Sequence, residues 1–81
     1  MTKYMTKRIK DIAGNGKLSV MHHALHTEKE LGKVCRRVWE HTNPQGSKFI
    51  FAKYIDPNDR SDETIVTLGF YCHLTYCYRH I

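Results

Sequence analysis

Apolar residues between positions 27 and 42 recur at spacings of three and four, the period of one face of an α-helix. Thr27 and Glu30 have the spacing of a capping box, in which the two side chains satisfy free backbone amides at a helix start. Asn43-Pro44-Gln45-Gly46 supplies a stop, because proline disfavours helical dihedrals in the preceding residue. We therefore predict a helix over residues 27–42. Its buried stripe is Leu31, Val34, Cys35, Val38 and Trp39.

Two stretches in the C-terminal half show the alternation that is typical of strands. Residues 47–55 are apolar on both faces, which indicates a central strand. Residues 64–78 alternate throughout, but 15 residues exceed the usual strand length, so Gly69 is expected to mark a dividing bulge or bend. The polar residues 56–63 predict a solvated loop between the two strands. The expected core-facing set is Val66, Leu68, Phe70, Cys72, Leu74, Tyr76 and Tyr78.

The first 26 residues give weaker patterns. Residues 1–13 mix apolar and basic side chains without a clear period, and their structure stays open. Gly14-Asn15-Gly16 predicts a chain reversal, because Asn-Gly tolerates the backbone angles of tight turns. Residues 17–26 fit a strand or, preferably, a short helix with Ser19 as its N-cap.

Together these elements predict an α+β fold, a small two-layer domain with one principal amphipathic helix packed on an antiparallel sheet. We expect residues 1–81 to form a single domain, since a chain this short buries only about 60% of its unfolded surface. No stretch reaches the roughly 20 apolar residues of a membrane helix, and no apolar run follows the basic N-terminus as in a secretory signal. A cytoplasmic protein without membrane contact is therefore expected.

The net charge of +5 is unevenly distributed along the chain. Residues 1–37 hold nine basic and three acidic residues and carry +6, whereas the remainder carries −1. This asymmetry favours an anionic partner, either nucleic acid or an acidic surface of a host protein, although such a charge also serves solubility. The expected contact residues are Lys29, Lys33, Arg36 and Arg37 on the outer face of the 27–42 helix, together with Lys7, Arg8 and Lys10.

One N-terminal segment adds weight to nucleic-acid binding. Ile9-Lys-Asp-Ile-Ala13, followed after five residues by Ser19, is similar to the start of the helix-turn-helix of lactose-repressor-type regulators. The resemblance implies DNA binding. The sequence departs from that family at His23 and His26, where aliphatic residues are usual, and at the glycines of the turn.

The C-terminal segment 71–80 gathers tyrosines, histidines, cysteines and an arginine. The order helix, strand, loop, strand resembles the RelE-type ribonuclease toxins, whose last strands present Arg, His or Tyr to an RNA phosphate. The resemblance implies His73 as general base or acid, Tyr76 as proton relay and Arg79 as phosphate clamp. Alternation places Tyr76 on the core face, which departs from that family. Strand aromatics serve otherwise as core or as a stacking platform for unpaired bases.

Zinc binding is a further alternative. If residues 17–26 are helical, His22 and His26 lie one turn apart, and Cys72 and Cys77 supply thiols. No Cys-x-x-Cys spacing completes a tetrahedral site, and histidines flanking a turn are ordinarily exposed or hydrogen-bonded. The odd number of three cysteines indicates reduced thiols, with Cys35 as a small buried hydrophobe.

No glycine-rich phosphate loop, nucleophile elbow or zinc-protease motif is present. We therefore expect a small basic binding or regulatory protein without catalytic activity or cofactor. It would engage nucleic acid or inhibit a nucleic-acid-handling host protein, and in general character it resembles accessory proteins of phages or mobile elements. An exposed edge strand or the Tyr-rich tail offers a surface for a homodimer.

Overall fold

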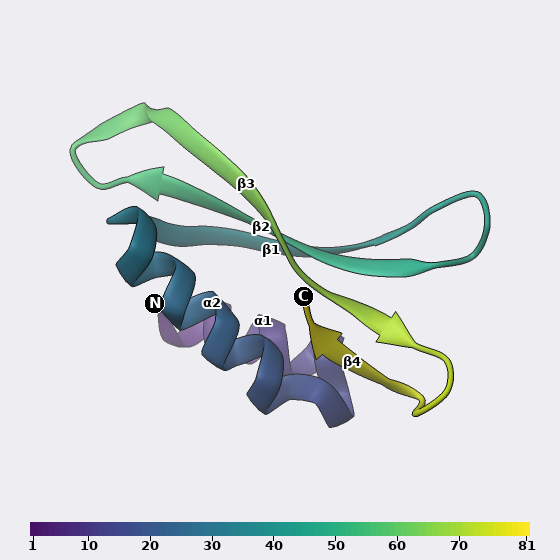
Figure 1. The fold of residues 1–81 in the computed structure, drawn as a ribbon. Coiled ribbons are helices and arrows are strands. Elements are labelled where there is room, and N and C mark those ends of the chain that lie inside the picture. Colours follow the sequence, from purple (N-terminus) through teal and green to yellow (C-terminus); the bar gives the residue numbers. More distant parts are fainter.

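The computed structural model describes residues 1–81 as two helices followed by four strands. The strands form one antiparallel sheet in the order β1-β2-β3-β4, and both helices lie on one side of it (Figure 1). The predicted two-layer α+β class is confirmed. The elements are α1 (Lys3–Ala13), a 3-10 turn η1 (Gly14–Gly16), α2 (Lys17–Leu31), β1 (Val34–Thr42), β2 (Lys48–Asp56), β3 (Asp59–Cys72) and β4 (Cys77–His80).

The N-terminal residues form the first helix of the layer. The hydroxyl of Thr2 accepts a hydrogen bond of 3.1 Å from the amide of Met5 and so caps α1. Met5, Ile9 and Ala13 follow at intervals of four and are buried, so one face of α1 packs on the rest of the protein. None of the helices is long and apolar enough to cross a membrane.

The predicted reversal at Gly14–Gly16 is confirmed, and η1 there connects helices that run in opposite directions (Figure 1). The preferred helix over residues 17–26 is also confirmed, and α2 continues to Leu31. Its N-cap is Gly16, without a side-chain hydrogen bond, so the prediction of Ser19 as N-cap is wrong.

The predicted helix over residues 27–42 is wrong. α2 ends at Leu31 because Gly32 adopts the left-handed conformation (φ 66°), and β1 begins two residues later. Thr27 lies inside α2, where its buried hydroxyl donates to the carbonyl of His23 (2.8 Å), so no capping box forms. Residues 43–46 do end an element, but that element is a strand.

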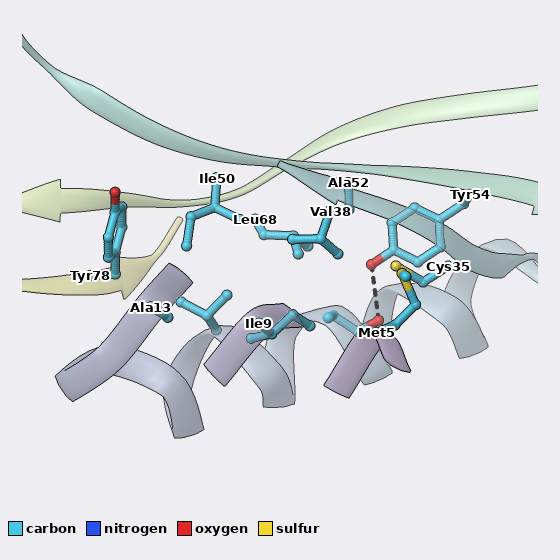
Figure 2. Close-up of a cluster of buried hydrophobic side chains, with 12 residues drawn as sticks. Met5, Ile9, Ala13, Cys35, Val38, Ile50, Ala52, Tyr54, Leu68 and Tyr78 are labelled. Atoms are coloured by element: carbon cyan, nitrogen blue, oxygen red, sulfur yellow. Dashed lines mark hydrogen bonds between the residues drawn. The ribbon is translucent and has the colours of Figure 1, made fainter. Parts of the chain in front are cut away.

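The hydrophobic core lies between the sheet and the helix pair (Figure 2). Alternate residues of β2 contribute Ile50, Ala52 and Tyr54, all fully buried, and the strand predicted over residues 47–55 is confirmed. The Tyr54 hydroxyl donates to the carbonyl of Ala24 on α2 (3.0 Å), which ties sheet to helix (Figure 2). The buried apolar cluster is Met5, Ile9, Ala13, Val20, Ala24, Cys35, Val38, Ile50, Ala52, Tyr54, Leu68 and Tyr78.

The strand predicted over residues 64–78 is two strands. β3 starts earlier, at Asp59, which shortens the predicted 56–63 loop to a tight turn, and residues 73–76 form a second turn before β4. A register shift opposite Ile50 and Phe51 produces a bulge next to Gly69, as expected, but the chain is divided at 73–76 instead.

This bulge buries Leu68 and Gly69 consecutively, so the residues that follow change face. Phe70 and Cys72 therefore lie on the opposite face from the one predicted. Leu74 and Tyr76 are exposed in the turn. Val66, Leu68 and Tyr78 do pack with the core as predicted.

The edge strand β1 is partly protected by helix side chains. The amide of Cys35 donates to the carboxylate of Glu28 (2.8 Å), and the carbonyl of Val38 accepts from Nε of Arg8 (3.4 Å). Both backbone groups thus have partners outside the sheet, which reduces the tendency of this edge to pair with another strand.

Candidate nucleic-acid interface

The sheet face turned away from the helices carries a row of aromatic side chains. Because side chains alternate along a strand, the neighbours of buried Val38, Ile50 and Ala52 project to this face. Ring centroids lie 5.8 Å apart for Trp39 and Phe51 and 6.4 Å apart for Phe49 and Phe51. We call Trp39, Phe49, Phe51 and Phe70 the aromatic platform.

The platform extends across the sheet. Trp39 on β1 is paired in register with Phe51 on β2, Phe49 on β2 with Phe70 on β3, and Phe70 with Arg79 on β4. Phe70 is 38% exposed, although it is large and apolar. The platform therefore extends over β1, β2 and β3, and Arg79 on β4 is paired with its last residue.

A cationic groove lies beside the other end of the platform. It is a cavity of about 270 Å³ between α1 and β1. The guanidinium of Arg37 lies 4.5 Å from the centroid of the Trp39 ring, a cation–π contact. Trp39 belongs to both features, so the groove adjoins the platform. We call this cavity the arginine groove; it is lined by Tyr4, Met5, Arg8, Arg36, Arg37, Val38 and Trp39.

A β-bulge places the two adjacent arginines of the groove. Cys35 pairs with Tyr54 and Arg37 with Lys53, so Arg36 is the extra residue of β1. The bulge lets both Cys35 and Val38 point into the core while Arg36 and Arg37 between them stay exposed. Two consecutive cations are thereby presented at the sheet edge.

None of the five arginines lies within 4.0 Å of a carboxylate. The ion pairs of the protein use lysines, His26 or the N-terminus instead. Arg36 also lines a cavity of about 530 Å³ that contains Asp56 and Glu63, but it forms no ion pair with either. The groove arginines are thus available to an external anion, and a guanidinium suits phosphate better than an ammonium does.

The structure separates the seven cations expected to contact a partner, four of which were predicted on one helix face. Arg36 and Arg37 join Arg8 in the arginine groove. Lys33 is largely buried and hydrogen-bonds Asp62 (2.8 Å) and Thr64 (2.7 Å). The remaining three lie elsewhere: Lys29 in the last turn of α2, and Lys7 and Lys10 beside a separate cavity of about 310 Å³ on α1.

The four alternative metal ligands do not converge. His22 and His26 line a cavity of about 430 Å³ with Ser19, His23 and His80. Cys72 and Cys77 face each other in the β3–β4 hairpin and do not line that cavity. No group of three or more His, Cys, Asp or Glu residues is placed to hold a metal ion.

The histidine cavity predicts an acid-sensitive stability. Burial lowers the pKa of His23, and His80 and His26 lower it further against the opposing effect of Glu30. A histidine with a lowered pKa binds protons more weakly when folded, so stability should fall as the pH drops below about 6.5. The urea concentration at the midpoint of unfolding should therefore change less between about pH 7.5 and about pH 5.5 for His23→Gln than for the wild type. The same change at His41, on the open sheet face, should leave the difference intact.

The structure divides the three residues proposed for RNA cleavage between a turn and a strand. His73 and Tyr76 lie in the exposed turn at 73–76, and Arg79 lies on β4. No hydrogen bond joins their side chains. Tyr76, expected on the core face, is 74% exposed with φ 55°; Tyr78 is buried instead and donates to Glu40.

Comparison with protein-family models, curated proteins and solved structures finds no match for this chain. Sequence reasoning missed the platform residues Phe49, Phe51 and Phe70. A usable indication was present, since residues 47–55 are apolar on both faces although only one helical layer is predicted to cover the sheet.

Proposed function

We propose that the protein binds single-stranded nucleic acid. In this proposal the arginine groove contacts the phosphate backbone and the aromatic platform stacks with unpaired bases. The function is a binding or regulatory one without catalysis.

The observation that carries the proposal is the combination of arginines without carboxylate partners and partly exposed aromatic rings at paired positions of the open sheet face. Arg37 and Arg79 stand at opposite ends of the aromatic row, so a chain that crosses the platform meets a cation on each side. A positively charged path with stacking rings suits nucleic acid strands without strong sequence preference. An acidic protein surface would use the arginines but would leave the row of rings without a partner.

The aromatic platform favours unpaired bases over a duplex. In a double helix the base faces are stacked on one another, and only the base edges and the phosphates are accessible. Ring-to-base stacking therefore requires unstacked nucleotides. A duplex could still bind the arginine groove through its phosphates, but more weakly.

Catalysis is not part of the proposal because the candidate residues are not organised for proton transfer. His73 and Tyr76 are exposed on a turn, and neither hydrogen-bonds with Arg79. An acid–base pair needs its groups within hydrogen-bond reach of the same substrate atoms.

Fluorescence anisotropy of labelled oligonucleotides tests the proposal. We expect single-stranded RNA and DNA to bind more tightly than a duplex of the same length, with affinity falling steeply between about 50 mM and about 200 mM salt. Negligible binding of every oligonucleotide at the lower salt concentration would overturn the proposal. The cationic surface would then be better explained by an acidic protein partner, such as a host protein that handles nucleic acid.

The single tryptophan reports directly on stacking. We expect a single strand to quench Trp39 fluorescence, because a base would lie on the indole. Trp39→Leu should weaken single-strand binding about five- to hundredfold, the loss expected for one base–ring stack, whereas Trp39→Phe keeps a ring and should retain most of the affinity. Circular dichroism should show that both variants are folded. Equal affinities of the two variants would then contradict stacking on Trp39. The phosphate contacts of the arginine groove are tested separately by the duplex titration.

A further inference from the structure

Two of the three cysteines face each other across the β3–β4 hairpin. Cys72 is the last residue of β3, Cys77 is the first of β4, and the two are paired in register. Opposed residues of antiparallel strands have Cα atoms about 4.5 to 5.5 Å apart, within the range of about 4.4 to 6.8 Å that a disulfide spans. The backbone therefore holds the two thiols at bonding reach. Both are free and partly exposed.

A single hydroxyl in the turn interacts with both sulfur atoms. Oγ1 of Thr75 lies 3.1 Å from Sγ of Cys77. Hydrogen bonds from the Thr75 hydroxyl and from the turn amides also lower the pKa of Cys72, and the charge of Arg79 contributes in the same direction. The turn thus stabilises a thiolate, the nucleophilic form of cysteine, next to a second thiol.

The third cysteine has the opposite environment. Cys35 is fully buried beneath the helix layer. Burial and the neighbouring carboxylate of Glu28 raise its pKa to about 11. Cys35 is therefore an internal control within the same chain. It stays protonated and out of contact with solvent, so it should resist oxidation.

We propose that Cys72 and Cys77 form a reversible dithiol site, which a peroxide or another two-electron thiol oxidant converts to an intramolecular disulfide. With hydrogen peroxide, the Cys72 thiolate attacks one oxygen and the O–O bond breaks, which gives a sulfenic acid and a hydroxide that takes up the proton lost by the thiol and becomes one water. The Cys77 thiolate then attacks that sulfur, which forms the S–S bond and releases the hydroxyl as a second water. Two electrons and two protons pass from the thiols to the peroxide.

The disulfide would link the two strands at the turn end of the hairpin. The same hairpin carries Phe70 of the aromatic platform and its paired residue Arg79. Each lies two residues away from one of the cysteines. The site would make the rigidity of this hairpin dependent on thiol oxidation. The inference is independent of the proposed function.

Stoichiometric hydrogen peroxide on the folded wild-type protein tests the site. We expect two of the three thiols to disappear, the mass to fall by two hydrogens, and peptide mapping to place the bond between residues 72 and 77. Dithiothreitol should restore both thiols. Loss of no thiols, a disulfide that includes Cys35, or linkage between molecules as the main product would each overturn the proposal.

Three variants separate the site from general oxidation. Cys35→Ala should form the disulfide as the wild type does, whereas Cys72→Ser and Cys77→Ser should not. Thr75→Val should slow the loss of thiols severalfold, because it removes the hydroxyl that stabilises the thiolate while leaving both cysteines in place. An unchanged rate in Thr75→Val would contradict the assigned role of the turn. Circular dichroism of each variant shows whether the hairpin remains folded.

Discussion

An Arg36→Ala, Arg37→Ala double variant is expected to bind single-stranded nucleic acid at least about tenfold more weakly than the wild type. Both guanidinium groups line the arginine groove and neither has a carboxylate partner, so their removal costs the folded state no ion pair and only the cation–π contact of Arg37 with Trp39. If each arginine contacts one phosphate, the slope of log affinity against log salt concentration should fall in magnitude by about two. Anisotropy titrations over a salt series measure both quantities.

The matched control removes the same charge from a different surface. Lys17→Ala, Lys29→Ala changes two exposed cations of α2, outside the groove, and should weaken binding by less than about threefold. Equal losses in the two double variants would mean that net charge alone drives binding, which would contradict the assignment of the groove.

Gly16→Ala is expected to lower the free energy of unfolding by about 3 kcal/mol or more. A Cβ atom at this position would lie 1.6 Å from the carbonyl oxygen of Tyr78, a distance that no side-chain adjustment can relieve because the contact is with backbone. The chain must either shift β4 away from the 3-10 turn or leave the Tyr78 ring out of the core. Urea denaturation of the two proteins measures the loss.

A second glycine provides the comparison. Gly32 has left-handed backbone angles (φ 66°, ψ 25°) and would place a Cβ in open space. Asparagine tolerates this conformation, so Gly32→Asn should cost less than about 1 kcal/mol. If the two substitutions destabilise the protein equally, close approach of β4 is not what requires Gly16.

The incorrect helix over residues 27–42 has a specific physical cause. A regular strand would place Cys35 and Val38 on opposite faces, but the bulge at Arg36 turns both inward. Their separation of three residues then coincides with the helical period. Gly32 marks the true boundary, since glycine is the usual residue just beyond a helix end, but the apolar period continues across it and imitates a longer helix.

The site could be predicted in part. The charge asymmetry predicts Arg8, Arg36 and Arg37 among the contact residues, and the fold brings these three into one groove. The aromatic row could not be read from alternation alone, because the bulge beside Gly69 moves Phe70 from the predicted core face to the open face. A one-residue register shift depends on how two strands fit together, which local sequence patterns do not contain.

The packing of β4 against the 3-10 turn also bears on how the protein is made. Gly16 and Ser19 meet Tyr78 and His80, more than 60 positions later in the chain, and Ser19 hydrogen-bonds Nδ1 of His80 (2.5 Å). A growing chain can form its helices and first hairpins early, yet one end of its core stays open to water until residue 78 has left the ribosome. The core cluster that contains Ala13, Val20 and Tyr78 is therefore closed only after β4 has been translated.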